Sequence, residues 1–240
     1  MFDQFILKTE NRNLPAQDIV DEDSRLLGEV HETGPLPVVR LWTNRSSIVV
    51  PARDNRLPGF DRAREILAQR NIQLATRTSG GTAVLHGPGV LNASVIFRVA
   101  KTEKVSMEAG YAKLMSLFDL LVPELAGQAC FASVPGAYCD GDYNLVVDGR
   151  KIAGTAQRIK SAGMKVEHRT ILAHMSLLVD IDALEMERTI NLYYEALQSD
   201  TRVREGVSTG ISNLCPVKLT CDSLIGRFVE KHDAGGKPAF

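Results

Sequence analysis

The hairpin signal at residues 143–156 limits the folds open to this chain more than any other feature. Two runs rich in apolar residues, 143–147 and 151–156, flank Asp148-Gly149, and an Asp-Gly pair supplies the positive φ that a two-residue type I′ turn requires. Such a turn joins antiparallel neighbours, whereas a Rossmann fold connects parallel strands through helices. The sequence therefore favours an α+β fold with a mainly antiparallel sheet flanked by helices.

Apolar spacing predicts the other elements. A recurrence at three to four residues indicates helices, and runs of β-branched or alternating apolar residues indicate strands. We expect Asp182 to cap the fourth helix, because its carboxylate can accept from the first free backbone N–H groups. The predicted helices cover 16–30, 60–69, 106–121, 184–196 and 219–229. The predicted strands cover 38–50 as a pair with a turn at 43–47, then 74–78, 83–85, 91–99 and 170–179.

Charge and cysteine content exclude several classes of protein. The 240 residues include 28 basic and 29 acidic side chains, so no electrostatic case exists for a nucleic-acid or membrane-surface partner. No apolar run reaches the ~18 residues of a membrane span, and the acidic, polar N-terminus is not a signal peptide. Four cysteines without a C-x-x-C pair favour a reducing cytoplasmic compartment and argue against a metal site. We expect one monomeric domain over 1–240, with a frayed tail at 232–240 and no accessory C-terminal domain.

Two glycine-rich segments flank one short predicted strand. Paired glycines in Arg77-Thr78-Ser79-Gly80-Gly81-Thr82 let a ligand approach the main chain, and the arginine brings a cation there. Spacing alone favours a β-bulge or tight turn without a ligand. His86-Gly87-Pro88-Gly89 is a rigid turn that puts His86 at a strand end, and by itself it is typical of an exposed histidine. Because the two segments lie only a few residues apart, we interpret them as one pocket wall.

Cys139 is the cysteine with the surroundings of a reactive thiol. It stands in the polar, glycine-containing loop Cys139-Asp-Gly-Asp-Tyr143, where exposure and nearby cations would make a thiolate available. Cys130, in Ala-Cys-Phe-Ala, and Cys221, within the predicted last helix, are expected to be packed or inert, and Cys215 before a proline is expected to be structural. An incidental loop cysteine explains Cys139 equally well on this observation alone.

Lys151 directly follows the predicted hairpin turn and precedes unusually small residues. An isolated lysine on a hairpin is usually a solvated edge residue. However, Ala153, Gly154 and Ala156 leave room beside it, and a strand with so little side chain is poorly stabilised unless something else fills that volume. His174, in an apolar strand, is interpreted as a core histidine.

Asp180 and Asp182 form the paired carboxylates of the sequence. Two residues apart in an extended segment, they share one face and could do acid–base work. A polar strand end followed by the helix cap at Asp182 is the better interpretation.

Four segments, in this order, resemble the lipoate–protein ligase and octanoyltransferase superfamily, over about residues 53–182. R-T-S-G-G-T-A-V (77–84) is similar to the family's R-x-S-G-G-x-A-V, and H-G-P-G-V-L-N-A-S (86–94) follows it. G-R-K-I-A-G-T-A-Q-R (149–158) resembles the segment with the family's invariant lysine, here Lys151. A-H-M-S-L-L-V-D-I-D (173–182) resembles H-G-S-L-L-x-x-x-D, with Met175 where glycine is usual. The resemblance implies a biotin/lipoate protein ligase-like catalytic domain.

A fifth segment points to one branch of that superfamily. A-Y-C-D-G-D-Y-N-L-V-V-D-G-R-K (137–151) is similar to the S-Y-C-P-G-x-Y-D-L-x-x-x-G-x-K of the octanoyl amidotransferases, with Asp140 in place of proline. The resemblance implies that Cys139 carries the acyl group as a thioester and that Lys151 polarises its carbonyl. It also implies walls of small residues (Gly80, Gly81, Ala153 and Gly154) for the acyl chain. The residues expected to bind acyl group or substrate are Arg77, Ser79, Gly80, Gly81, Thr82, His86, Asn92, Gly154, Thr155 and Ala156.

The same resemblance implies the partners and leaves two alternatives. The amidotransferase branch takes octanoyl from the glycine-cleavage H protein to lipoyl domains of 2-oxoacid dehydrogenases, and the H-G-P-G turn also resembles transferases that use acyl carrier protein. That reaction needs no cofactor. An ATP-dependent lipoate–protein ligase, requiring ATP and Mg, would leave Cys139 incidental. A catalytically silent acyl-binding or acyl-carrier-docking module is the third possibility. Whether the acyl group is octanoyl or lipoyl is open at this stage.

Overall fold

The computed structural model describes residues 4–9, 14–34, 36–103, 106, 108–162 and 166–233, which form two β-sheets and five α-helices. In the larger sheet, of seven strands, every neighbouring pair is antiparallel except the first, so the expected mainly antiparallel sheet is confirmed. In spatial order its strands are β1 (Ile6–Thr9), β2 (Val38–Trp42), β6 (Val90–Ala100), β10 (His168–Leu178), β9 (Arg150–Lys160), β8 (Asn144–Val147) and β7 (Cys130–Ala132).

The smaller sheet corrects one prediction. It consists of β4 (Gln73–Arg77), β3 (Ser47–Pro51) and β5 (Val84–His86), with β3 in the middle. The stretch 38–50 was expected to form a strand pair, but β2 and β3 belong to different sheets. All ten residues of the two strands are buried, and each strand has a neighbour on both sides. In these positions the backbone N–H and C=O groups of both strands find partners along both edges.

The helices lie close to the predicted positions. Asp182 caps the fourth helix as expected, because its carboxylate accepts from the backbone N–H groups of Leu184 and Glu185. The last helix extends to Asp233, so His232 and Asp233, predicted as tail, are helical, and 234–240 lie outside the described residues. The α-helices are α1 (Ala16–Glu32), α2 (Phe60–Ala68), α3 (Glu108–Leu121), α4 (Ala183–Ala196) and α5 (Cys221–Asp233). Short 3-10 helices are η1 (Ala52–Arg56), η2 (Pro123–Leu125) and η3 (Ile211–Asn213).

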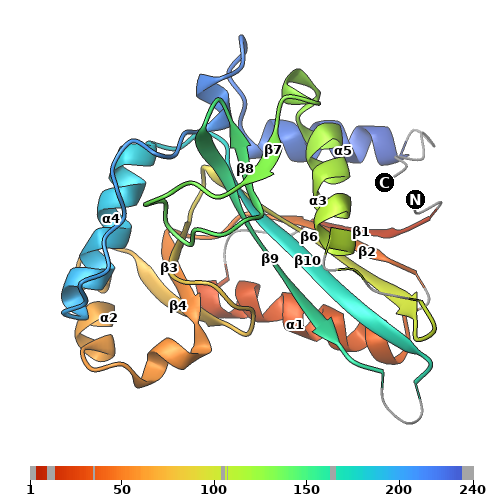
Figure 1. Ribbon diagram of the computed structural model, residues 1–240, viewed down its shortest axis with the longest axis horizontal. Helices are drawn as coiled ribbons and strands as arrows, with labels where there is room; N and C mark the ends of the chain where they lie inside the picture. The colour runs from red at the N-terminus through yellow and green to blue at the C-terminus, as the bar shows by residue number, and fades with distance from the viewer. Residues whose placement is uncertain are drawn as a thin grey trace.

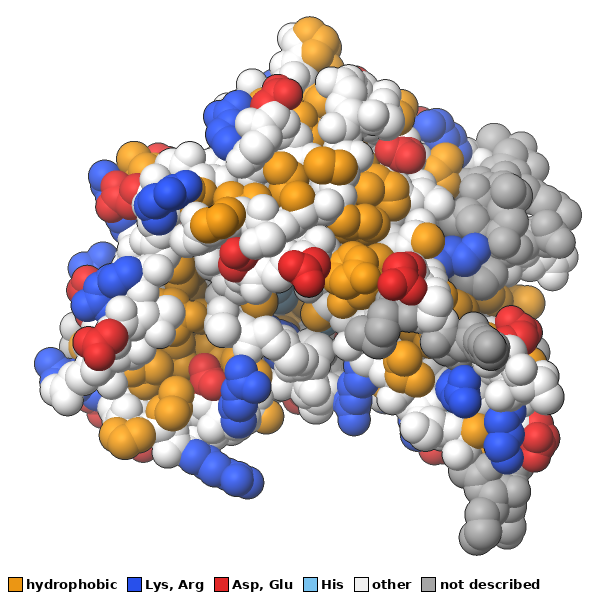
Figure 2. Space-filling view, viewed as in Figure 1, with side chains coloured by type: hydrophobic (Ala, Val, Ile, Leu, Met, Phe, Trp, Pro, Cys, Tyr) orange, Lys and Arg blue, Asp and Glu red, His pale blue; other side chains and the backbone are white. Residues whose placement is uncertain are grey.

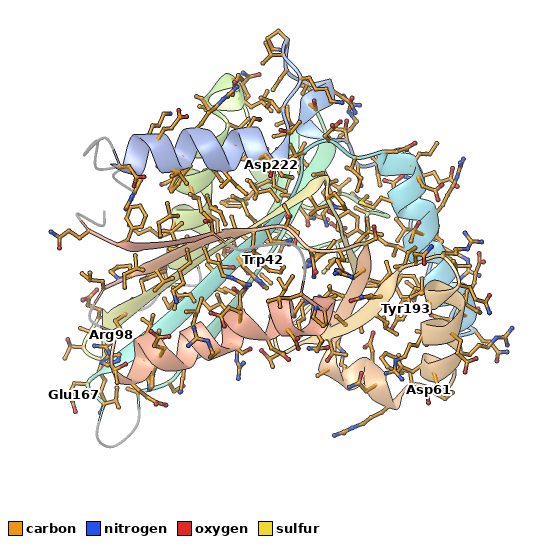
Figure 3. The ribbon with its side chains drawn as sticks, turned by 180° about the vertical axis from the view of Figure 1, so that it is seen from behind. Trp42, Asp61, Arg98, Glu167, Tyr193 and Asp222 are labelled. Atoms are coloured by element: carbon orange, nitrogen blue, oxygen red, sulfur yellow. The ribbon has the colours of Figure 1, made fainter. Side chains whose placement is uncertain are left out.

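The helices form layers on both sides of the large sheet (Figure 1). The apolar faces of α3 and α5 pack on one side, around residues such as Leu114, Phe118 and Phe228. On the other side α1 contributes Leu26 and Val30 to a smaller cluster. Figure 3 labels Trp42 between the large sheet and α1. Because side chains alternate along a strand, each strand of the large sheet divides its residues between these two layers.

The turn between β8 and β9 has the conformation that its sequence predicts. Asp148 has φ of 49° and Gly149 has φ of 72°, the two positive values of a type I′ turn. The turn fixes the register in which β9 starts, and Lys151 is its second residue. The hairpin therefore brings this lysine back beside the loop that precedes β8.

The smaller sheet, α2 and α4 form the other end of the molecule (Figure 1). Their core includes Ile48, Leu67 and Tyr193, and it continues into the large sheet through Trp42 and Leu178. The junction of the two sheets is where the glycine-rich segments and the Cys139 loop converge. Of the helices that the structure describes, none is long and apolar enough to cross a membrane.

Candidate active site

A narrow pocket lies between α1, the face of the large sheet that α1 covers, and the smaller sheet. We call it the inner pocket; its volume is about 50 Å³. Apolar side chains from α1, β2, β3, β5 and β10, together with Cys139, share its wall with a set of polar residues. Its lining comprises Val20, Asp21, Asp23, Ser24, Trp42, Val49, Arg77, Thr78, Ser79, Val84, His86, Cys139, Gly154, Thr155, Ala156, Leu172, His174 and Ser176.

Cys139 is held in a strained position at the wall of this pocket. Its φ of 43° lies in the left-handed region that residues with a side chain seldom adopt. Its Sγ accepts a hydrogen bond from the backbone N–H of Thr82, at 3.2 Å. The side chain is half-buried, so the sulfur is neither sealed in the core nor free in solvent. Strained backbone of this kind recurs at functional sites, where the surrounding contacts maintain it.

Asp140 supplies the contacts that hold the cysteine loop. Its carboxylate accepts from the Val134 and Gly141 N–H groups, the Ser133 hydroxyl and the Asn144 amide, at 2.8–2.9 Å. Although partial burial opposes it, these donors lower the pKa of Asp140. The aspartate thus orders the loop by hydrogen bonds to its backbone and side chains.

Lys151 lies directly beneath the cysteine loop and is fully buried. Its Nζ donates to the carbonyl of Tyr138 at 2.5 Å and to that of Cys139 at 3.2 Å. The ammonium also lies 3.9 Å from the centroid of the Tyr138 ring. Burial lowers the pKa of Lys151 to about 8, against the opposing effect of Cys139 and Asp140. The lysine is therefore close to the point at which it gains or loses its proton at neutral pH.

The backbone of residues 206–209, which we call the strap, keeps this lysine in place. The N–H of Lys151 donates to the Val207 carbonyl, and its carbonyl accepts from the Thr209 N–H, both at 2.9 Å. The strap is held in turn by Glu187 of α4, which is fully buried. Its carboxylate accepts from the N–H groups of Gly206 and Ser208, at 2.6 and 3.0 Å. Sequence reasoning missed Glu187, because a charged residue within a helix shows no sign of a partner about twenty residues away.

Arg77 organises the glycine-rich turn. Its guanidinium donates to the carbonyls of Val49, Gly80 and Thr82, at 2.7–3.2 Å. Burial lowers the pKa of Arg77 from its ordinary value. At Gly81, with φ of +94°, a Cβ would lie 2.5 Å from Cys139 Sγ and 2.9 Å from Arg77 Nη2. The glycine is thus required by the sulfur and the guanidinium that flank it.

A buried ion pair lies behind the inner pocket. Arg40 Nη1 is 2.7 Å from Asp23 Oδ1, and both side chains are almost fully buried. Asp23 also accepts from the Ser94 hydroxyl at 2.8 Å, and its Oδ2 is 3.6 Å from His174 Nδ1. Burial alone would raise the pKa of Asp23, but His174 and Arg40 lower it. His174 was expected in the core; instead it is half-buried on the pocket wall, because its strand presents alternate residues to α1.

His86 is buried and does not have the exposed position that its turn alone would suggest. Burial lowers its pKa to about 3, so the ring is neutral. It packs edge-on against Trp42, with ring centroids 5.4 Å apart, and its Nε2 is 3.2 Å from Ser176 Oγ. His86 Nδ1 and Trp42 Nε1 are buried without a hydrogen-bond partner among the described residues. The pocket therefore offers polar atoms beside its apolar wall.

The expected binding residues divide into three groups. Seven residues named from the sequence line the inner pocket: Arg77, Ser79, His86, Cys139, Gly154, Thr155 and Ala156. Others support it from behind: Gly80 and Gly81 form the turn, Lys151 lies under the cysteine loop, and Asn92 accepts from Ser176 Oγ at 2.7 Å. Thr82 touches the sulfur through its N–H but lines a second pocket.

Two smaller expectations were wrong. Ala153 does not line the pocket, because strand alternation turns it into the core under α3, although its neighbour Gly154 lines the pocket. Cys130 is exposed rather than packed, since β7 is the edge strand of the large sheet.

Several lining residues escaped sequence reasoning. Val20, Asp23, Trp42, Val49 and Leu172 come from elements whose apolar pattern indicated only core packing. Which core residues face a pocket depends on how α1 and the second sheet are placed, and no local signal gives that. Within the described part of the chain, no cluster of His, Cys, Asp or Glu could hold a metal ion.

The chain matches known proteins over most of its length. Residues 17–233 match the family model for the lipoyl protein ligase A/B catalytic domain. An octanoyl-GcvH:protein N-octanoyltransferase of Kyrpidia tusciae is 36% identical over 212 residues, covering 85% of this chain and 71% of that protein. A protein of the same name from Oceanobacillus iheyensis is 35% identical over 217 residues, covering 87% and 74%.

A solved structure agrees in fold. A lipoate-protein ligase A bound with ATP superposes with a TM-score of 0.68 at 15% identity, covering 97% of this chain and 85% of that one. The expected ligase-like fold is confirmed by this likeness. The family match over 17–233 and the two relatives at 36% and 35% identity establish that the chain belongs to the lipoyl protein ligase A/B catalytic domain family.

Proposed function

We propose that this protein is an octanoyltransferase that moves the acyl group through a thioester on Cys139 to a lysine of a lipoyl-dependent protein. The observation that carries the proposal is the position of the thiol: Cys139 Sγ lies at the wall of a partly apolar pocket, held by a backbone N–H, above a buried lysine. The names of the relatives from Kyrpidia tusciae and Oceanobacillus iheyensis support octanoyl as the group transferred.

In the first step the Cys139 thiolate attacks the carbonyl carbon of the acylated donor. A C–S bond forms, the bond from carbon to the donor lysine nitrogen breaks, and that nitrogen leaves as an amine after taking up a proton. Lys151, with a pKa of about 8, is able to supply positive charge and a proton close to this carbonyl. The backbone N–H groups of Gly80 and Gly81 in the turn share this role for the oxyanion, while the N–H of Thr82 holds the sulfur.

In the second step the uncharged amine of the acceptor lysine attacks the thioester carbon. A C–N bond forms, the C–S bond breaks, the attacking nitrogen gives up one proton to the uncharged Lys151 amine left by the first step or to solvent, and the thiolate is regenerated. The two steps use the same carbonyl position, so one set of donors serves both tetrahedral intermediates. The scheme breaks one amide bond and forms another, with the thioester between them. No nucleotide is consumed.

The acyl tail is proposed to lie in the inner pocket. Val20, Trp42, Val49, Val84 and Leu172 offer it apolar contacts. Each buried methylene contributes about 0.8 kcal/mol, so an eight-carbon chain gains several kcal/mol of binding free energy. Gly154 has no side chain, and Ala156 has only a methyl group. These two residues of β9 therefore leave the acyl chain room along the pocket wall.

We further propose the octanoylated glycine-cleavage H protein as donor and lipoyl domains of 2-oxoacid dehydrogenases as acceptors. The enzyme is incubated without ATP, separately with octanoylated H protein and with octanoyl-acyl carrier protein, and its intact mass is measured. We expect an octanoyl adduct that maps to Cys139 and disappears when an apo lipoyl domain is added.

The matched control is Cys130, the most exposed of the four cysteines. Cys130→Ala is expected to acquire the adduct at the wild-type rate, whereas Cys139→Ala acquires none. Labelling that requires ATP and free octanoate, and survives Cys139→Ala, would instead identify an adenylating ligase. Tight acyl binding with neither adduct nor transfer would identify a silent binding module.

A further inference from the structure

A second, wider pocket lies across the glycine-rich turn from the inner one. We call it the outer pocket; its volume is about 450 Å³. It is formed by the segment around η1 and by the end of α4 with the residues that follow it. Its lining comprises Arg53, Asp54, Leu57, Pro58, Thr82, Tyr194, Leu197, Gln198, Ser199 and Thr201.

The outer pocket borders the turn that contacts Cys139, on the side away from the inner pocket. Thr82 belongs to its lining, and the N–H of the same residue donates to Cys139 Sγ. The turn that separates the two pockets carries no side chain at Gly80 or Gly81, and a Cβ added at Gly80 would meet nothing within 4 Å. Arg53 Nη2 donates to the Gly81 carbonyl at 2.9 Å, so the open part of the turn is at Gly80. A group seated in the outer pocket can extend past Gly80 to a thioester on the sulfur, whose acyl chain occupies the other side.

The floor of the outer pocket is apolar, and the negative charge of Asp54 beside it is balanced by neighbouring groups. Leu57, Pro58 and Leu197 provide its apolar surface, and Leu57 is 44% exposed. Asp54 is largely buried; it accepts from the Tyr193 hydroxyl at 3.0 Å and lies 3.9 Å from Arg53. Figure 3 labels Tyr193 of α4 and Asp61 of α2 at the same end of the molecule, and Figure 2 shows hydrophobic side chains gathered at that end.

The rim carries an excess of positive charge. The side chain of Arg53 is 71% exposed, and Arg56 and Arg202 are exposed beside it on η1 and after α4. Asp200 is the exposed acid among them. With its single negative charge the four exposed side chains carry a net charge of +2, although Arg53 also donates to the Gly81 carbonyl and Arg202 to those of Ser199 and Thr201. A surface of this kind attracts a protein segment rich in acidic residues and speeds its encounter.

We propose that the outer pocket docks the lysine-bearing turn of the protein substrates, and that acidic side chains flanking that lysine pair with the arginine rim. The aliphatic stem of the lysine lies over the apolar floor, and its nitrogen reaches the sulfur past Gly80. This inference rests on the proposed function and adds to it the surface that recognises the partner.

The test compares one protein donor with one small donor on the full-length enzyme. Cys139 acylation is followed by intact mass with octanoylated H protein, over a range of NaCl concentrations, and with octanoyl-N-acetylcysteamine, which has no protein surface. The variants are Leu57→Asp and Arg56→Glu. The matched control is Arg70→Glu, an exposed arginine beyond the other end of α2. Circular dichroism verifies that each variant is folded.

With the protein donor, we expect both variants to raise KM at least tenfold, and Arg56→Glu to flatten the dependence of KM on salt. The rate with the small thioester is expected to change less than twofold, and Arg70→Glu to match the wild type with both donors. Wild-type KM values in both variants, or an equal loss with both donors, would overturn the docking proposal alone. If neither donor acylates the wild-type enzyme, the proposed function fails and the docking proposal fails with it.

Discussion

Replacing Gly81 by alanine is expected to separate activity from stability. The added Cβ would lie 2.5 Å from Cys139 Sγ, about 1 Å closer than carbon and sulfur atoms normally approach, so the sulfur or the turn has to move. The φ of +94° adds a backbone cost of about 1–2 kcal/mol for a residue with a side chain. A displacement of about 1 Å at a reacting atom reduces rates roughly 100-fold.

The stability loss should be small by comparison. A cost of about 1–2 kcal/mol lowers the Tm of a domain of this size by about 2–8 °C. We therefore expect Gly81→Ala to remain folded at 25 °C while the rate of Cys139 acylation by octanoylated H protein falls roughly 100-fold. Intact mass spectrometry measures the rate, and differential scanning calorimetry measures the Tm.

Gly80→Ala is the control for this prediction. Its Cβ would enter open space and its φ is not positive, so with octanoyl-N-acetylcysteamine, which has no lysine to cross the turn, it is expected to retain most of the acylation rate while Gly81→Ala loses it. If Gly81→Ala acylated as fast as the wild type, the sulfur would not need the position seen here. An equal loss in both variants would show that the turn tolerates no side chain for a reason other than the sulfur.

Three further predictions concern charged side chains in or behind the site. Because the pKa of Lys151 is about 8, the acylation rate should fall as pH rises through that value and the ammonium loses its charge. Lys151→Met should be slow, and its pH–rate profile should lack this decline at high pH. Glu187→Gln should lower kcat about tenfold with KM for the donor unchanged, since the strap that holds the lysine loses one acceptor; a change in KM alone would contradict this role. Arg40→Met should destabilise the protein by about 3–5 kcal/mol in urea unfolding, because Asp23 remains buried without its ion-pair partner, and an unfolding midpoint equal to that of the wild type would refute that reasoning.

Local signals predicted the individual elements well. The apolar periods placed all five helices, and Asp148-Gly149 predicted the turn that starts β9. Pairing between segments distant in the sequence was less accessible. Strands β2 and β3 had equally apolar sequences, and the choice of partner for each depends on which pairing buries both faces.

The candidate site was predicted in part for a similar reason. Cys139, Lys151 and the glycine-rich turn could be named because polar loops, hairpin turns and paired glycines carry recognisable patterns. Asp140 and Glu187 act on backbone N–H groups, and the sequence gives no indication of which N–H a carboxylate will meet. His174 looked like a core residue because its neighbours are apolar.

The sequence by itself determined the five helices, the inner strands and the tight turn at Asp148-Gly149, because propensity, apolar period and turn conformation act over a few neighbouring residues. It did not indicate the short edge strands β1 and β7, which depend on the neighbour that each one pairs with. The tertiary structure decided that the Thr82 N–H contacts Cys139 and that the carbonyls of Tyr138 and Cys139 accept hydrogen bonds from Lys151. It also decided that a pocket remains between α1 and His174. These contacts join elements tens of residues apart. They exist only when the two sheets and α1 pack together and bury the groups that then have to find partners.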